Sequence, residues 1–369
     1  NANDQATHKV DVITEEKQSK FTFGGYGEIH ANFTDGGSSY LDIHRFVLFL
    51  GYQFNEWIRL SSEVELEHAW TDEGYVLIEQ LYADFLLSDP ISIRAGRMLA
   101  PLGIVNQNHE PILFLGVERP NVAKYIIPST WSIDGAGLFG APVSWLTYEV
   151  YGVAGLEGQN FDGSDGIRGG RMKGRQGLDD PAITGRIDLF PVSTDNQDLR
   201  FGLSGYYGGT DNAPKGGTGT PSVDNTLAMY SADFSYTLSR FRFNGVVAHG
   251  NNSNAQDLEA AYGNGTGEEL FGWYIEGGVD VMPASWKTGK LKESSFIPFI
   301  RYDHYDTQYK VPGNVVKDDA NDRSEITVGV NWLLTRNFVI KADTQFLSNE
   351  AIGSDVNNKY NLGLGWVFN

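Results

Sequence analysis

The chain has 369 residues and a formal net charge of −19, which disfavours a nucleic-acid partner because phosphate binding needs a basic surface. It contains no cysteine, so disulfides and thiolate metal sites are excluded. Hydrophobic residues make up 41% of the chain, yet no uninterrupted apolar stretch approaches the roughly 18 residues that a membrane-spanning helix needs.

Residues 1–19 are polar and lack sustained periodicity, so we expect a leader that precedes a single domain at residues 20–369. The domain opens with a clear alternation. Phe21, Phe23 and Phe33 fall on one face, and Glu28 and His30 fall on the other. A period of two is typical of a strand, because successive side chains leave opposite faces. Apolar groups on one face and polar groups on the other suit a strand between lipid and water.

The same alternation recurs along nearly the whole chain and predicts 16 strands. An even number puts both termini on one side, as in bacterial single-chain barrels. We therefore predict an all-β fold, a 16-stranded antiparallel transmembrane β-barrel. The predicted strands span residues 21–33, 45–54, 58–67, 75–87, 91–99, 131–141, 145–154, 182–189, 199–207, 226–238, 241–249, 270–281, 296–306, 324–333, 338–347 and 359–368.

The connections between these strands alternate in length. One set of connections is mostly tight and includes residues 88–90, 142–144 and 239–240. The other set is longer and glycine-rich and includes residues 156–181 and 250–269. Short turns on one side and long loops on the other are the arrangement of outer-membrane barrels. The leader and the short turns would then lie on the periplasmic side.

One long connection, at about residues 100–130, carries an unusual number of large apolar side chains, among them Ile112, Phe114, Tyr125 and Ile127. A disordered loop has few such residues, so we expect this segment to pack against something. The inner wall of the barrel is the surface we favour, which makes the segment an inward-folded constriction loop. The alternatives are a cap on the extracellular rim or a contact with a neighbouring subunit.

The run Arg94-Ala95-Gly96-Arg97-Met98-Leu99-Ala100-Pro101-Leu102-Gly103 resembles the strand and turn before the constriction loop of trimeric porins, in particular the phosphate-selective (O and P type) porin superfamily. The segment 298–302 and the aromatic C-terminal strand support the resemblance. It implies 16 strands, three protomers per assembly and a third loop that narrows each pore. Two features depart from the family. Asn369 follows the terminal aromatic residue, and the loop has no basic cluster, so phosphate selectivity is not carried over.

The inward phase of the strands and the constriction loop supply the candidate site. Charged rings or ladders set the preference of a pore through the local field, so Glu63, Glu65 and Glu67 opposite Arg45 and Arg59 could produce a transverse field. The other interpretation is a set of ion pairs that stiffen the wall, and the two are compatible. The predicted pore-lining residues are Glu28, Arg45, Arg59, Glu63, Glu65, Glu67, Arg94, Arg119, Lys124, Arg186, Arg301 and Lys341.

Two further groups have open interpretations. Tryptophans near strand ends, among them Trp57, Trp70, Trp131 and Trp145, fit the aromatic belts of a membrane interface, with a sugar-stacking track as the alternative. The basic run at 168–175 could attract anions or contact lipopolysaccharide phosphates, although solvated loop charge is the simpler explanation.

The sequence contains no Gly-x-Ser-x-Gly or His-Glu-x-x-His motif, and it predicts no catalytic residue, cofactor or metal site. We expect a porin of a Gram-negative outer membrane rather than an enzyme. It would form a polar, water-filled channel for passive diffusion of small hydrophilic solutes or ions, with lipid, lipopolysaccharide and two further copies of the chain as partners. A non-conducting structural or adhesive barrel is the main alternative, and a barrel enzyme the lesser one.

Overall fold

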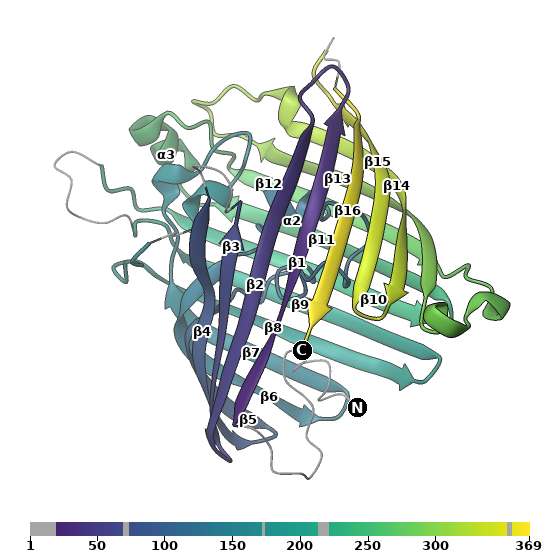
Figure 1. The fold of residues 1–369 in the computed structure, drawn as a ribbon. Coiled ribbons are helices and arrows are strands. Elements are labelled where there is room, and N and C mark those ends of the chain that lie inside the picture. Colours follow the sequence, from purple (N-terminus) through teal and green to yellow (C-terminus); the bar gives the residue numbers. More distant parts are fainter. Residues whose placement is uncertain (1–19, 69–73, 172–173, 213–220, 353–355) are drawn as a thin grey trace.

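The computed structural model describes residues 20–68, 74–171, 174–212, 221–352 and 356–369, so the predicted leader at 1–19 lies outside the described residues. In this part of the chain, 16 strands form one closed barrel (Figure 1). Each strand is antiparallel to its neighbours, and β1 pairs with β16 to close the cylinder. The strands are β1 (Phe21–Thr34), β2 (Tyr40–Asn55), β3 (Ile58–Glu67), β4 (Tyr75–Ser88), β5 (Ile91–Leu99), β6 (Ser132–Val143), β7 (Leu146–Ala154), β8 (Pro181–Thr194), β9 (Gln197–Gly209), β10 (Thr226–Leu238), β11 (Phe241–Asn252), β12 (Glu269–Val279), β13 (Ser295–Lys310), β14 (Asp322–Thr335), β15 (Phe338–Asn349) and β16 (Lys359–Phe368).

The fold class and the number of strands are confirmed. Several strands are longer than predicted, and β2 and β8 exceed their predicted lengths by the most residues. The second begins at Tyr40, and its register against β1 shifts between Glu28 and His30. The eighth, predicted to end at residue 189, continues past Pro191 to Thr194, although proline cannot donate a ladder hydrogen bond. A register shift between Leu189 and Val192 accommodates the proline.

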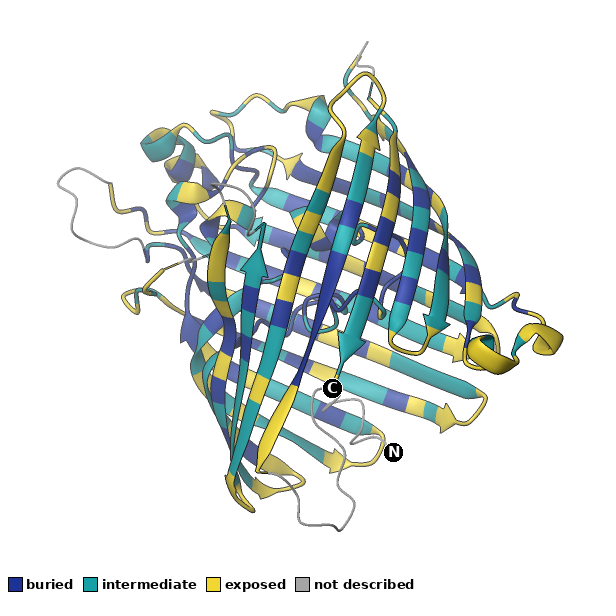
Figure 2. Ribbon diagram, viewed as in Figure 1, coloured by how far each residue is buried: buried dark blue, intermediate teal, exposed yellow. Residues whose placement is uncertain are grey.

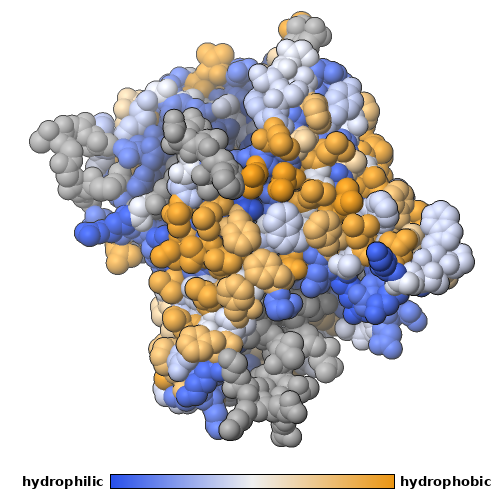
Figure 3. All heavy atoms as spheres, in the orientation of Figure 1, coloured by the Kyte–Doolittle hydropathy of each residue, from blue (hydrophilic) through white to orange (hydrophobic). Residues whose placement is uncertain are grey.

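The outer face of the barrel is apolar. Burial alternates residue by residue along the strands (Figure 2), and large apolar side chains form a broad band across the visible face (Figure 3). The exposed members of this outer surface include Phe46, Leu50, Leu81, Leu203, Ile275, Ile300 and Leu362. Among the described residues, no helix is long and apolar enough to cross a membrane.

Long connections gather at the end of the barrel opposite the C-terminus. They include the described parts of the connections after β7 (155–171 and 174–180) and after β9 (210–212 and 221–225). They also include residues 253–268 with the helix α3 (Ala255–Tyr262) (Figure 1). Loop 3, which is residues 100–131 and contains the helix α2 (Val122–Tyr125), follows β5 and folds into the lumen. The other end has turns such as 56–57 and 239–240, together with one longer connection at 280–294.

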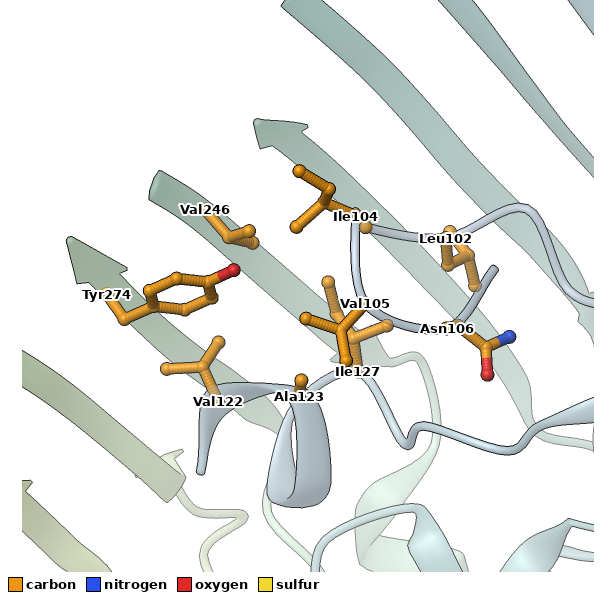
Figure 4. Close-up of a pocket in the computed structure, with 10 residues that line it drawn as sticks. Leu102, Ile104, Val105, Asn106, Val122, Ala123, Ile127, Val246 and Tyr274 are labelled. Carbon is orange, nitrogen blue, oxygen red and sulfur yellow. The ribbon is translucent and has the colours of Figure 1, made fainter. Parts of the chain in front are cut away.

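Part of the lumen is filled by apolar side chains, which we call the lumenal apolar cluster. It joins loop 3 to the inner faces of β4–β13 and to the long loops above them. Figure 4 shows Val122 and Ile127 of loop 3 beside Val246 and Tyr274 of the wall. The cavity between them measures only about 10 Å³, which is room for about one water molecule. The expectation of a polar lumen is therefore wrong for this part of the wall, because loop 3 covers it.

A charge on the outer surface tests the assignment of the faces. Leu203 lies in the middle of β9 and is 59% exposed, so Leu203→Arg should lower the free energy of unfolding in lipid by about 2–4 kcal/mol. Leu238→Arg, at the end of β10, is the control and should cost about 0–1 kcal/mol. Urea unfolding in phospholipid vesicles measures both, and equal costs would contradict the assignment.

Candidate functional site

Loop 3 is fastened to the lumenal wall by basic side chains. Arg45 of β2 donates to the carbonyl oxygen of His109 at 2.7 Å, and Arg186 of β8 donates to that of Gly103 at 2.9 Å. Three further bonds come from β13 and β15. Lys341 donates to the carbonyls of Phe114 at 3.1 Å and Gly116 at 2.7 Å, and Arg301 donates to that of Leu115 at 3.2 Å. Four of the predicted pore-lining bases thus hold the loop across the lumen.

Wall acceptors complete the attachment by binding the N–H groups of the loop. The N–H of Val117 donates to Asp343 at 2.6 Å, and that of Gly116 donates to Asn331 at 3.1 Å. Gly116 has φ of +85°, a conformation that L side chains rarely adopt, so the glycine allows its carbonyl and its N–H to face different wall residues. Buried backbone groups need hydrogen-bond partners, and here the wall supplies them.

A glycine of the C-terminal strand makes room for the loop. A Cβ atom on Gly365 would lie 2.6 Å from Cβ of Pro111, which is closer than packed atoms approach. The small residues that alternate with aromatics on β16 therefore face loop 3, and their size permits its close contact with the wall.

Glu28, Arg45 and His109 form a buried network with Tyr26. Arg45 donates to Glu28 at 2.6 Å and to the hydroxyl of Tyr26 at 3.0 Å, and this hydroxyl lies 2.9 Å from Nε2 of His109. All four side chains are at most 2% exposed. Loop 3 and Arg45 thus meet in a buried set of hydrogen bonds.

The three glutamates of β3 occupy different environments. Glu63 and Glu65 are buried; Gln80 donates to Glu63, and Glu65 lies 3.7 Å from Arg45. Glu67, at the end of the strand, is partly exposed and accepts a hydrogen bond from Tyr75. The glutamates therefore do not form one uniform acidic ladder.

Arg59 and Arg94 share one carboxylate at some distance from the loop contacts. Asp84 accepts from Arg59 at 2.7 Å and from Arg94 at 2.7 and 3.1 Å. The guanidinium of Arg94 also lies over the ring of Tyr82, 4.0 Å from its centroid. Both arginines are partly exposed on the lumenal side. The ion-pair interpretation thus describes their contacts well.

The two predicted cations of loop 3 do not join the wall network. Arg119 donates to Ser129 at 3.0 Å within the loop, and Lys124 is exposed on α2. The neighbouring residue Glu118, just before Arg119, contacts His30 at 3.2 Å and Asn32 at 3.0 Å. Burial alone would raise the pKa of Glu118, but these two partners hold that pKa well below its usual range.

Sequence reasoning missed three features of this region. Glu79 enters the lumen because β4 has a bulge at this residue, and His109 reaches the wall only through the folding of loop 3. Trp131, predicted as a belt anchor, is 1% exposed and packs against Tyr206 in the lumenal apolar cluster. Trp57 and Trp145 are exposed near strand ends, as a belt requires, whereas Trp70 lies outside the described residues. The bulge interrupts the period of two at Glu79, and the contacts of loop 3 follow no sequence period, so no sequence signal marks Glu79 or His109.

Two arginines of the basic run after β7 donate hydrogen bonds to the backbone of loop 3. Arg171 donates to the carbonyl of Ser129 at 2.7 Å, and Arg168 donates to that of Lys124 at 3.4 Å. Residues 172–173 of the run lie outside the described residues. These two arginines connect two loops, which the sequence alone does not indicate.

Comparison with solved structures gives the fold class. OmpF of Salmonella typhi, in complex with daunomycin, matches with a TM-score of 0.60 and 13% identity over 94% of this chain and 97% of that one. An anion-selective porin from Comamonas acidovorans matches with a TM-score of 0.57 and 10% identity, over 94% and 99% of the two chains. OmpT, an outer membrane protein of Vibrio cholerae in its trimer form, has a TM-score of 0.55 and 11% identity, over 94% and 98%. The chain therefore has the fold of the outer-membrane porins.

Sequence comparison adds one relative and no family. An uncharacterised protein of Aquifex aeolicus is 28% identical over 365 residues, which cover 94% of this chain and 80% of that protein. No protein-family model matches the sequence. The resemblance to phosphate-selective porins stays a prediction within the porin fold.

Removal of one wall donor tests the attachment of loop 3. Lys341→Met deletes two hydrogen bonds, each worth about 0.5–1.5 kcal/mol. Since about 1.4 kcal/mol is a factor of ten, the amides of Gly116 and Val117 should exchange hydrogen about tenfold faster or more. Mass-spectrometric hydrogen exchange gives the rates. The exposed Lys359→Met is the control, and an unchanged rate in the Lys341 variant would refute the attachment.

Proposed function

We propose that this protein is a porin of a bacterial outer membrane, through which small hydrophilic solutes or ions diffuse passively. The observation that carries the proposal is loop 3, which folds into a closed 16-stranded barrel and is held there by charged wall residues. A loop that narrows a barrel without filling it sets the size and charge of what passes. The apolar outer surface supports a location in lipid.

Partly exposed charged groups on both sides of loop 3 indicate where solutes would travel. On the side of the long loops, His44 and Glu67 keep about a fifth of their side-chain surface exposed, and on the other side Arg59 and Arg94 keep slightly less. These residues belong to β2–β5, the part of the wall that faces away from most of the lumenal apolar cluster. We therefore place the path beside β2–β5.

The same geometry limits the width of that path. Between these two exposed groups, the side chains of Arg45, Glu63 and Glu65 are at most 2% exposed. A passage at this level must be narrow, so the proposal is a channel of low conductance for small solutes rather than a wide general pore.

The buried layer and the lumenal apolar cluster favour a second candidate, a barrel that does not conduct. Such a protein would serve as a structural or adhesive element, with its long loops as the active surface. The two candidates share the fold and differ only in whether solutes cross the level of Arg45.

Planar-bilayer recordings of the purified protein separate the candidates. A porin produces discrete conductance steps, whereas the structural barrel inserts silently. A variant with Arg45, Glu28 and Glu65 all changed to alanine opens the buried layer and should give larger steps than the wild type. Steps from the variant alone would overturn the porin proposal in favour of the closed barrel. Lipase and protease assays on the same sample test the expectation that the protein is not an enzyme.

Wall charges beside the path should bias its ion preference. A charge about 8 Å from an ion in water contributes about 0.5 kcal/mol. For each charge removed, Arg59→Gln with Arg94→Gln should therefore raise cation permeability about twofold and lower anion permeability about twofold, which raises the cation-to-anion permeability ratio. Reversal potentials under a salt gradient measure this ratio. Arg336→Gln, an exposed change at the β14–β15 turn, is the control. An unaltered permeability ratio in the double variant would show that ions do not pass beside Arg59 and Arg94.

We also propose a homotrimer in contact with lipopolysaccharide. One structural match is described as a trimer form, and the basic run near Arg168 and Arg175 lies among the long loops. Chemical cross-linking in detergent, followed by mass measurement, tests the trimer.

A further inference from the structure

A buried group of metal-ligand side chains lies where loop 3 meets β3 and β4. Glu63 of β3, Glu79 of β4 and His109 of loop 3 bring their ligand atoms within 4.8 Å of one another, and all three residues are buried. They come from three separate segments of the chain, so the arrangement exists only when loop 3 is folded into the lumen.

A β-bulge turns Glu79 into this group. In the β3–β4 ladder Glu63 pairs with Gln80 but Val64 pairs with Ile78, so Glu79 is the extra residue. Glu79 and Gln80 are consequently both buried, although they are neighbours in a strand, while Ile78 is exposed on the outer surface. Bulges often re-aim a side chain at a functional site. Here the bulge brings a carboxylate inside that regular alternation would direct to lipid.

The carboxylate of Glu79 lacks the partners that burial demands. It has no exposed surface, and neither oxygen has a hydrogen-bond partner among the described residues. Its ionic contact is Nε2 of His109 at 3.3 Å. The nearby guanidinium of Arg45 is already shared by Glu28 at 2.6 Å and Glu65 at 3.7 Å. A buried carboxylate is stable only when it is paired, protonated or bound to a metal ion.

His109 is oriented as a metal ligand. Its Nδ1 lies 2.8 Å from the carbonyl oxygen of Asn106, which can only accept, so Nδ1 carries the hydrogen. Nε2 then faces both Glu79 at 3.3 Å and the hydroxyl of Tyr26 at 2.9 Å. A carbonyl on the far ring nitrogen is the usual support of a metal-binding histidine. The 3.3 Å between Nε2 and Oε2 of Glu79 also equals the separation of about 3.3 Å between two ligands of a tetrahedral Zn²⁺ ion with bonds of about 2.0–2.1 Å.

We propose that Glu63, Glu79 and His109 bind one divalent transition-metal cation of the Zn²⁺ type. One imidazole with two carboxylates suits Zn²⁺, whereas Ca²⁺ and Mg²⁺ take oxygen ligands and would not use the histidine. The cation compensates the buried carboxylates and fastens loop 3 to β3 and β4, next to the hydrogen bond from Arg45 to the same loop residue. This site does not depend on whether the barrel conducts.

A second group of possible ligands provides an internal comparison. Asp42, His44 and His68 also lie within ligand distance of one another, but they are partly exposed. Asp42 accepts hydrogen bonds from His44 at 2.9 Å and from His68 at 2.8 Å, so the carboxylate is already satisfied. A metal bound at this group would be lost on substitution of His44, and a metal at the buried group would not.

The test uses the folded full-length chain, stripped with EDTA and titrated with ZnCl₂ by isothermal calorimetry. We expect one Zn²⁺ per chain. Glu79→Gln, which keeps the shape of the side chain, and His109→Gln should each weaken binding by about 10- to 100-fold or more, since even supporting residues of metal sites have such effects. His44→Gln is the matched control and should bind as the wild type does.

Far-ultraviolet circular dichroism verifies that each variant retains the barrel. If a variant does not fold, hydrogen exchange of the wild type decides, because Zn²⁺ should slow the amides of residues 106–110 and leave residues 42–44 unaffected. Absence of stoichiometric binding, loss of binding only in His44→Gln, or unslowed exchange at 106–110 would each overturn the proposal. A proton would then compensate Glu79. Zinc binding is measured independently of conductance, so a protein that inserts into bilayers without conducting would contradict the porin proposal and not the metal site.

Discussion

The structure depends on one constraint: a loop that crosses the inside of a barrel must find a hydrogen-bond partner for every buried backbone group. Loop 3 meets this constraint with side chains of the wall. Arg45, Arg186, Arg301 and Lys341 donate to its carbonyls, and Asp343 accepts from its amide. The bases are therefore fixed in place by the backbone of the loop, which gives their buried donors hydrogen-bond partners.

This attachment divides the lumen into two parts. Where loop 3 meets the lumenal apolar cluster on β4–β13, apolar side chains such as Leu102 and Ile126 contact apolar wall residues. Each buried side chain contributes about 1.5–3 kcal/mol. Where the loop approaches β1–β4, charged groups meet in ion pairs and hydrogen bonds. Paired charges still produce a field, so the wall pairs and the proposed ion preference have a common origin.

The sequence predicts the barrel well because each strand carries its own period of two. The outward position of Leu203 and the inward position of Glu28 follow from that local pattern, and the structure agrees. The apolar composition of loop 3 also predicts its packing. Bulges and contacts between distant segments do not follow from this local pattern. Glu79 breaks the alternation at a bulge, and His109 meets it only through the tertiary fold. The sequence therefore predicts the site residues that lie on regular strands, but not Glu79 and His109, which a bulge and the folded loop bring together.

The placement of loop 3 against β16 is tested most directly by a designed disulfide, since the chain has no native cysteine. A Cβ atom on Gly363 would lie 3.6 Å from Cβ of Val117, within the range of about 3.5–4.5 Å found in disulfides. The account predicts that the variant with Val117→Cys and Gly363→Cys oxidises almost completely in the folded barrel, as measured by resistance to maleimide labelling after unfolding. Two free thiols in a correctly folded barrel would show that loop 3 does not cross the lumen to this strand.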